Sequence, residues 1–133
     1  MLGTNVLISG LLSPDNPPGQ IIDGLRRERI QLTLDDRIFA EYSKVIWRPK
    51  FDRFIQPEER EWILDYIFNH SQRLVAETSV NDLPDVKDAA FLEIAATAQV
   101  PLVTGNLKHY PNKKRRGVKV LSPAEYILWW DEE

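Results

Sequence analysis

Short apolar runs alternate with amphipathic stretches along this chain, and this alternation restricts the fold more than any other feature of the sequence. The apolar runs have the length and composition of buried strands, whereas the stretches between them carry apolar residues at helical spacing. Strands that alternate with helices form a parallel sheet with helices packed on its faces. We therefore predict an α/β fold in three α/β/α layers, with about five strands in a central, doubly wound parallel sheet.

The limits of the predicted elements come from local signals. Asp35 is a suitable N-cap, Pro49 requires the preceding helix to end near Arg48, and Ser122 to Glu125 form a capping box with proline at the first helical position. The sequence predicts helices at 20–29, 36–47, 57–71, 85–99 and from 123 toward 130, and strands at 4–12, 30–34, 74–75, 100–106 and 117–121.

The composition excludes several classes of protein. The chain has 133 residues, of which 43% are hydrophobic, so we expect one compact domain over residues 1–133. It has no cysteine and two histidines, which excludes thiolate metal sites and argues against a histidine-rich zinc site, so any metal must be bound by oxygen. Without a signal-peptide pattern or an apolar run of ~20 residues, we expect a soluble, cytoplasmic protein with no membrane contact.

Two segments are expected at the carboxyl ends of strands, where open parallel sheets bind ligands. The first is Gly3 to Asn5, and the second is the turn from Thr104 to Asn106. The second segment is also compatible with an ordinary strand-to-loop turn, because glycine and asparagine are common in turns for steric reasons.

Glu41 and Asp88 are candidate site residues because of their helical positions. Glu41 borders the apolar arc of the helix that follows Asp35. It either faces the site or is a boundary residue that extends into water or pairs with Lys44 or Arg37. Asp88 shares a helix face with three apolar residues, Phe91, Leu92 and Ala95.

A buried carboxylate needs a partner or a metal, which favours a functional Asp88. Alternatively, Asp85 is the N-cap and Asp88 is a first-turn acid. Glu93, on another face of the same helix, is expected to be solvated. If Glu41, Asp88 and Asn106 face one crevice, they form a candidate site for a cation that prefers oxygen ligands.

Four motifs in register resemble those of PIN-domain proteins, in particular the toxin components of prokaryotic toxin–antitoxin pairs. They are TNVLISGLLSP, AEYSKVIWRPKF, PDVKDAAFLEIA and LVTGNLKHYP, and the resemblance extends to the closing VKVLSPAEYI. It implies a PIN-like fold, an acidic cluster that binds Mg²⁺ or Mn²⁺, and hydrolysis of single-stranded RNA. It also implies a small antitoxin protein as partner and a homodimer.

The resemblance assigns roles position by position. Glu41 and Asp88 match the acids of the second and third motifs, and Asn106 stands at the fourth, so these three are the implied catalytic and metal-binding residues. Asn5, Thr104 and Asp85 are implied to support them. The family's first motif begins Asp-Thr-Asn, whereas this chain has Gly3-Thr4-Asn5, so the first catalytic aspartate and the strand residues that usually precede it are missing.

Gly3 leaves two hypotheses for the function. In the first, the chain is a metal-dependent endoribonuclease whose activity is reduced because Gly3 replaces the first catalytic aspartate and leaves Glu41 and Asp88 as the clear charged ligands. In the second, it is a catalytically inactive PIN-like binding module that retains the dimer and antitoxin surfaces.

The segment KHYPNKKRRG also has two interpretations. It is either a rim that binds RNA phosphates, with Tyr110 as a stacking face, or a solvated turn before the last strand. The residues predicted to bind RNA are Lys108, Lys113, Lys114, Arg115 and Arg116. Trp129 and Trp130 are expected to serve packing or dimer contacts.

Overall fold

The computed structural model describes residues 1–131, in which helices alternate with short parallel strands, as the α/β class requires. The helices are α1 (Thr4–Leu12), α2 (Pro17–Arg26), α3 (Asp36–Ile46), α4 (Pro57–His70), α5 (Ala89–Ala98) and α6 (Pro123–Asp131). The strands are β1 (Thr33–Leu34), β2 (Gln72–Arg73), β3 (Leu102–Val103) and β4 (Val120–Leu121). Short 3₁₀ turns are η1 (Pro49–Phe51), η2 (Val86–Asp88), η3 (Leu107–His109) and η4 (Asn112–Lys114).

Within residues 1–131 the strands form two parallel pairs instead of the single sheet of about five strands that we predicted. β1 pairs with β2, and β3 pairs with β4. Leu2 forms a parallel bridge with Val103 and thereby adds a fifth extended segment beside β3. Each strand is two residues long, so most of the buried apolar side chains lie on helices.

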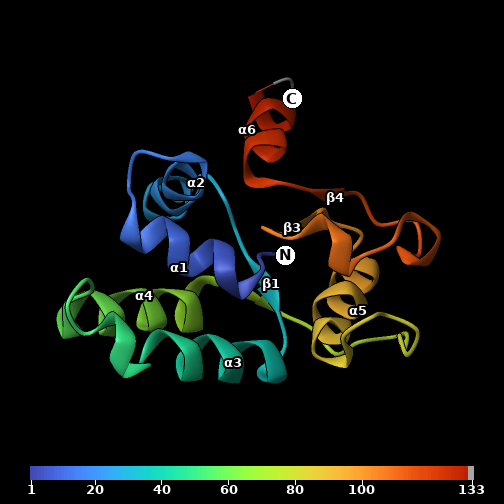
Figure 1. Cartoon of the computed structure of the whole chain (residues 1–133), viewed down its shortest axis with the longest axis horizontal. Coiled ribbons are helices and arrows are strands. Elements are labelled where there is room, and N and C mark those ends of the chain that lie inside the picture. The colour runs from blue at the N-terminus through green and yellow to red at the C-terminus, as the bar shows by residue number, and fades with distance from the viewer. Residues whose placement is uncertain (132–133) are drawn as a thin grey trace.

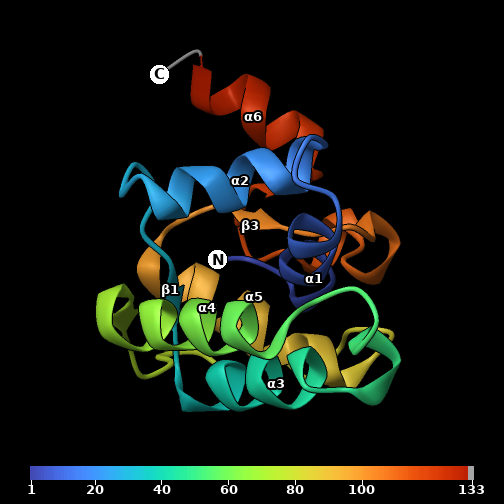
Figure 2. The same ribbon diagram turned by 90° about the vertical axis from the view of Figure 1, so that its left-hand side faces the viewer.

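The helices lie on two sides of the strands. Figure 1 shows α1 to α4 on one side of β1 and α5 on the other, and Figure 2 shows α3 and α4 side by side. Helix α6 extends along α2, where Trp130 lies close to Gly24. This contact agrees with the predicted packing role of Trp130. Leu128, on the same helix, is 66% exposed.

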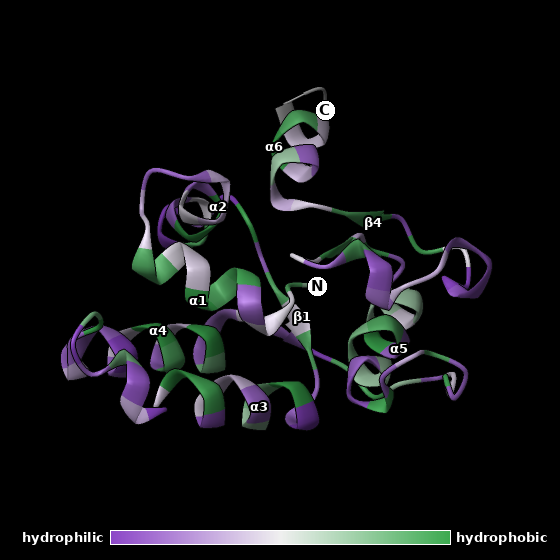
Figure 3. Cartoon of the chain, in the orientation of Figure 1, coloured by the Kyte–Doolittle hydropathy of each residue, from purple (hydrophilic) through white to green (hydrophobic). Residues whose placement is uncertain are grey.

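Helix α1 corrects our prediction of a strand at Thr4–Leu12. Its apolar side chains are buried on almost all sides, and Figure 3 accordingly shows it mainly in green and white. A continuous apolar run of this kind cannot be distinguished from a buried strand by periodicity. Gly10 allows α1 to approach α2, because a Cβ there would lie 2.6 Å from the carbonyl oxygen of Pro18. The extended segment precedes the predicted one and is marked by Leu2.

Several boundary predictions are confirmed. The Asp35 carboxylate accepts a hydrogen bond from the Ile38 amide at 3.0 Å, so Asp35 is the N-cap of α3. Ser122 and Glu125 bond reciprocally through side chain and backbone, at 2.8 and 3.1 Å, which completes the predicted capping box. Helices α3 and α4 alternate between purple and green in Figure 3, as amphipathic helices do. None of the helices described is long and apolar enough to cross a membrane.

Two other elements are displaced from their predicted limits. The strand predicted at 74–75 lies at Gln72–Arg73, where Gln72 pairs with Thr33 and Arg73 with Leu34. Val75 is 86% exposed, so its apolar character gave a misleading signal. The helix predicted at 85–99 begins as the 3₁₀ turn η2 and becomes α-helical at Ala89.

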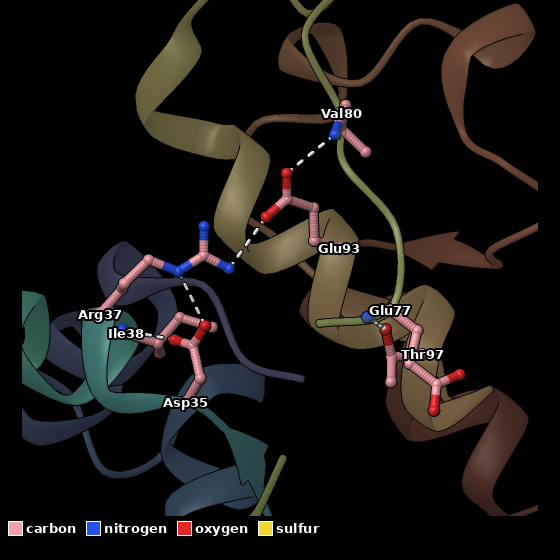
Figure 4. Close-up of polar contacts among 7 residues, drawn as sticks. All are labelled: Asp35, Arg37, Ile38, Glu77, Val80, Glu93 and Thr97. Carbon is pink, nitrogen blue, oxygen red and sulfur yellow. Dashed lines mark hydrogen bonds and ion pairs between the residues drawn. The ribbon is translucent and has the colours of Figure 1, made fainter. Parts of the chain in front are cut away.

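Glu93 is buried, contrary to our prediction that it is solvated (Figure 4). Its Oε1 lies 2.8 Å from Nη2 of Arg37, which also pairs with Asp35, and its Oε2 accepts a hydrogen bond from the Val80 amide at 2.8 Å. The extended segment before η2 lies along α5 and covers the face that helical periodicity assigns to solvent. Glu93 therefore joins three parts of the chain: α3, α5 and this segment.

Candidate active site

A cleft of about 220 Å³ contains every residue that we predicted to form or support the site. Its walls come from the start of α1, the middle of α3, η2 and the segment that follows β3. The predicted residues in its lining are Gly3, Thr104, Asn5, Glu41, Asp85, Asp88 and Asn106.

Glu41 faces this cleft from α3 and is half-buried. Its Oε2 accepts a hydrogen bond from the hydroxyl of Thr4, at the first turn of α1. The alternative partners do not hold it in the described part of the chain, since Arg37 pairs with Asp35 and Glu93 and the exposed Lys44 forms no ion pair with Glu41. The structure thus places the Glu41 carboxylate at the border of the core, against a neutral donor.

The side chain of Asp88 is 19% exposed, and one of its carboxylate oxygens lacks a hydrogen-bond donor among the described residues. Nδ1 of His109 lies 3.0 Å from its Oδ2, yet among the described residues no well-aligned hydrogen bond reaches this buried oxygen. Burial raises the pKa of Asp88, the charge of His109 opposes this rise, and the carboxylates of Asp85 and Glu41 add to it. The folded protein therefore disfavours the ionised form of Asp88.

Asp85 and Asp88 have separate roles, so the alternative that we considered for them holds in part. The Asp85 side chain accepts a hydrogen bond from the Lys87 amide at 2.9 Å and caps η2. Asp88, one turn later, lies at the cleft without capping a helix through its side chain.

Asn106 is held from two sides. Its backbone N–H donates to the Thr104 hydroxyl at 3.1 Å, and its Nδ2 lies 2.8 Å from Nε2 of His109. His109 therefore lies between Asp88 and Asn106 and lines the cleft, although our sequence reasoning counted it only as one of the two histidines that are too few for a zinc site. Its position three residues after Asn106, in the same motif, was the available signal.

Gly3 has a backbone that any residue can adopt, with φ −65° and ψ 148°. Its N–H donates to the Val103 carbonyl at 2.8 Å, and it is the N-cap residue of α1. A Cβ at this position would meet the Val103 oxygen at 3.2 Å, a contact that a shift of a few tenths of an ångström relieves. A side chain at position 3 is thus sterically feasible at the edge of the cleft.

The residues present fit one divalent cation better than two. No group of three histidine, cysteine or acidic side chains in residues 1–131 is arranged to hold a metal. The available donors are the carboxylates of Glu41 and Asp88, including the unsatisfied Oδ2 of Asp88, and the side-chain carbonyl of Asn106. This set suits Mg²⁺ or Mn²⁺, because Mg²⁺ commonly binds one or two carboxylates and retains several waters.

A larger hollow of about 630 Å³ lies over the Asp35, Arg37 and Glu93 ion pairs, but its acidic residues are less available. Asp35 and Glu93 pair with Arg37, and Asp36 pairs with Arg73 at 3.2 Å. We therefore take the smaller cleft as the candidate active site.

The basic side chains that we predicted to bind RNA lie outside the lining of the cleft, although His109 and Tyr110 of the same segment are part of it. Within the described residues, the cleft wall includes none of the five predicted basic side chains: Lys108, Lys113, Lys114, Arg115 and Arg116. Nε of Arg115 donates to the Tyr110 carbonyl at 2.7 Å, and Arg116 pairs with Asp82 at 2.8 Å, which favours the solvated-turn interpretation for these two. RNA contact by the three lysines stays a prediction. Tyr110 is 3% exposed, which argues against the interpretation in which its ring is a stacking face for RNA bases.

Comparison with known proteins identifies the family of this chain. The PIN domain model matches residues 1–108, which is most of the chain. The chain belongs to the PIN domain family. PIN domains are generally nucleases and typically use divalent metals.

An uncharacterized protein of Methanocaldococcus jannaschii is a similar relative, and no solved structure matches the chain. It is 28% identical over 136 residues, which cover 96% of this chain and 88% of the relative. The similarity to this relative therefore spans almost the whole chain.

Proposed function

We propose that this PIN-domain protein is a metal-dependent endoribonuclease that hydrolyses single-stranded RNA, and that Gly3 limits its activity. The observation that carries the proposal is the convergence of Glu41, Asp88 and Asn106 on one cleft, with a buried Asp88 oxygen that lacks a well-aligned donor among the described residues. Buried carboxylates without a full set of partners are characteristic of metal and catalytic sites.

In this proposal the chain's own residues bind and orient. Glu41 and Asp88 are the charged ligands of Mg²⁺ or Mn²⁺, and Asn106 is a neutral ligand. The Thr4 hydroxyl fixes one oxygen of Glu41, and His109 holds the amide nitrogen of Asn106, which leaves the other amide atom for the cleft. The cation, when bound, supplies positive charge that acidifies water and stabilises charge on the phosphate.

The missing acid at position 3 predicts a weak site. Two carboxylates offset the charge of a single divalent cation, whereas a third negative ligand strengthens its binding. This feature also supports a second candidate function, a PIN-like binding module that no longer cleaves RNA.

A cellular role follows from the resemblance alone. We propose that the protein is the toxin of a toxin–antitoxin pair, acts in the cytoplasm, binds a small antitoxin protein and forms a homodimer. The motifs quoted above support this role, and coexpression with the product of a neighbouring small gene, followed by copurification, tests it.

The test of the nuclease proposal compares acids inside and outside the cleft. We expect calorimetry to detect Mn²⁺ binding by the parent. We expect Glu41→Gln and Asp88→Asn to lose this binding and to lose any cleavage of single-stranded RNA that the parent shows. Glu61→Gln and Asp65→Asn, exposed acids on α4, are the matched controls and should behave like the parent. Equal Mn²⁺ binding by all five proteins would contradict the proposed site.

A further inference from the structure

Two basic side chains that our sequence analysis did not select, Arg48 and Lys87, line the candidate active site. Arg48 follows the end of α3, where Pro49 keeps it in an extended conformation with φ −60° and ψ 135°. Lys87 lies in η2, between Asp85 and Asp88. The two cations thus reach the cleft from separate elements.

Both side chains are exposed and, in the part of the chain that the structure describes, neither forms an ion pair or a side-chain hydrogen bond. Six arginines elsewhere in the described chain are engaged by acids. Ion pairs with acids hold Arg26, Arg27, Arg37, Arg60, Arg73 and Arg116. Arg48 and Lys87 therefore remain available although the acids of the cleft lie close by.

A polyanion needs such cations in order to approach this cleft. The carboxylates of Glu41, Asp85 and Asp88 give the cleft a negative field that repels phosphate. A guanidinium presents several donors in a planar fork that matches phosphate oxygens, and an ammonium acts as a point charge. Placed beside the acids, Arg48 and Lys87 offset this field where a strand of RNA would cross the cleft.

We propose that Arg48 and Lys87 bind the phosphates of single-stranded RNA next to the bond to be cleaved. This inference rests on the proposed nuclease function, and it places these two phosphate contacts in the cleft wall, apart from the segment 113–116. A merely structural role is the competing explanation, because a cation near the end of α3 also complements the helix dipole.

The test measures RNA binding apart from cleavage. A fluorescein-labelled single-stranded RNA is titrated with the full chain in EDTA at several KCl concentrations, and fluorescence anisotropy is recorded. We expect Arg48→Gln and Lys87→Gln each to weaken binding about three- to tenfold, and to reduce the slope of log K against log salt by about 0.7 for each lost phosphate contact. Arg48→Lys should keep the slope while binding less tightly.

Lys44→Gln and Arg53→Gln, which remove exposed cations outside the cleft lining, are the matched controls. Unchanged affinity and salt slope in Arg48→Gln and Lys87→Gln, with tight binding by the parent, would overturn this inference and leave the nuclease proposal intact. No RNA binding by the parent would overturn the inference and also the choice of RNA as substrate. Equal losses in the controls would show a general effect of net charge and likewise overturn it.

Discussion

Two sets of carboxylates lie between α3 and the segment formed by η2 and α5, and they differ in their partners. Asp35 and Glu93 both pair with Arg37, and Glu93 also accepts a backbone hydrogen bond (Figure 4). Glu41 and Asp88 contact a hydroxyl and an imidazole instead. The two carboxylates of the first set share one cation, Arg37, within the protein, so this set fixes the structure. The second leaves negative charge for a ligand.

The difference matters because the first set positions the second. Arg37 and Glu41 are one turn apart on α3, and Glu93 follows Asp88 by five residues on the other wall. The Arg37–Glu93 ion pair therefore fixes the separation of the two elements that carry Glu41 and Asp88. A stable paired network next to an incompletely paired site is the arrangement expected for preorganised metal ligands.

The largest expected loss of stability comes from breaking the first set of carboxylates, Asp35 and Glu93, which pair with Arg37. Glu93→Ala removes one of the two carboxylate partners of Arg37 and leaves the buried Val80 amide without its acceptor. Because Arg37 is 53% exposed and can turn to water, we expect a loss of about 2–3 kcal/mol in the free energy of unfolding, less than for a fully buried pair. Urea denaturation measures it, with Glu77→Ala, an exposed acid before η2, as control. A loss equal to that of the control would contradict a structural role for Glu93.

A smaller loss of stability is expected when Glu41, in the second set of carboxylates, loses the hydroxyl that donates a hydrogen bond to it. Thr4→Val keeps the shape of the buried Thr4 side chain but removes the hydroxyl that donates to Glu41. Glu41 is half-buried and can recruit water, so we expect destabilisation of about 1 kcal/mol together with weaker Mn²⁺ binding. Thr4→Ser, which keeps the hydroxyl, should restore the Mn²⁺ affinity. If Thr4→Ser binds Mn²⁺ no better than Thr4→Val, the hydroxyl does not position Glu41.

The smallest expected effect is a gain in stability, in contrast to the two losses above, and it comes from removing the charge of Asp88. Burial raises the pKa of Asp88 in the folded chain, so folding disfavours its ionised form. Stability relative to an uncharged residue is therefore highest below the unfolded pKa of about 3.9 and falls as the pH rises through the folded pKa. We expect Asp88→Asn to be more stable than the parent by about 0.5 kcal/mol at pH 7 and to lose this advantage near pH 4.

Thermal unfolding in EDTA between pH 4 and pH 8 measures this difference. Asp65→Asn, on the exposed face of α4, should show no such trend. An Asp88→Asn protein that is less stable than the parent at pH 7 would mean that the contact with His109 outweighs the cost of burial.

The sequence predicted features that depend on local chemistry. The Asp35 cap, the Ser122–Glu125 box and the position of Glu41 at the edge of the apolar arc of α3 each involve residues within one or two helical turns. The shared cleft of Glu41, Asp88 and Asn106 followed from the order of elements in an α/β fold and from the resemblance to PIN domains.

Features that depend on distant parts of the chain were missed. Burial of Glu93 requires the segment around Val80 to cover α5, and helical periodicity carries no information about such a cover. α1 is buried on nearly all sides, so its apolar run has no period that separates helix from strand. The place of Arg48 in the cleft wall depends on how the chain turns after α3, which Pro49 alone does not determine.

The central claim is that the cleft is a metal site that lacks one carboxylate. Gly3 is at the N-cap of α1, where aspartate is a favoured residue, and its backbone conformation suits any residue. Gly3→Asp therefore adds a carboxylate to the cleft at the cost of a shift of a few tenths of an ångström against the Val103 carbonyl oxygen. Gly105→Asp is the matched control, because it adds the same charge to the cleft lining at a position where a Cβ meets no atom within 4 Å.

The most direct measurement is calorimetric Mn²⁺ binding by the parent, Gly3→Asp and Gly105→Asp chains, with cleavage of a single-stranded RNA followed in parallel. We predict that Gly3→Asp binds Mn²⁺ at least about tenfold more tightly than the parent and cleaves RNA faster, and that Asp88→Asn abolishes both gains. A Gly3→Asp chain that folds like the parent but gains no Mn²⁺ affinity, or gains no more than Gly105→Asp, would contradict the claim.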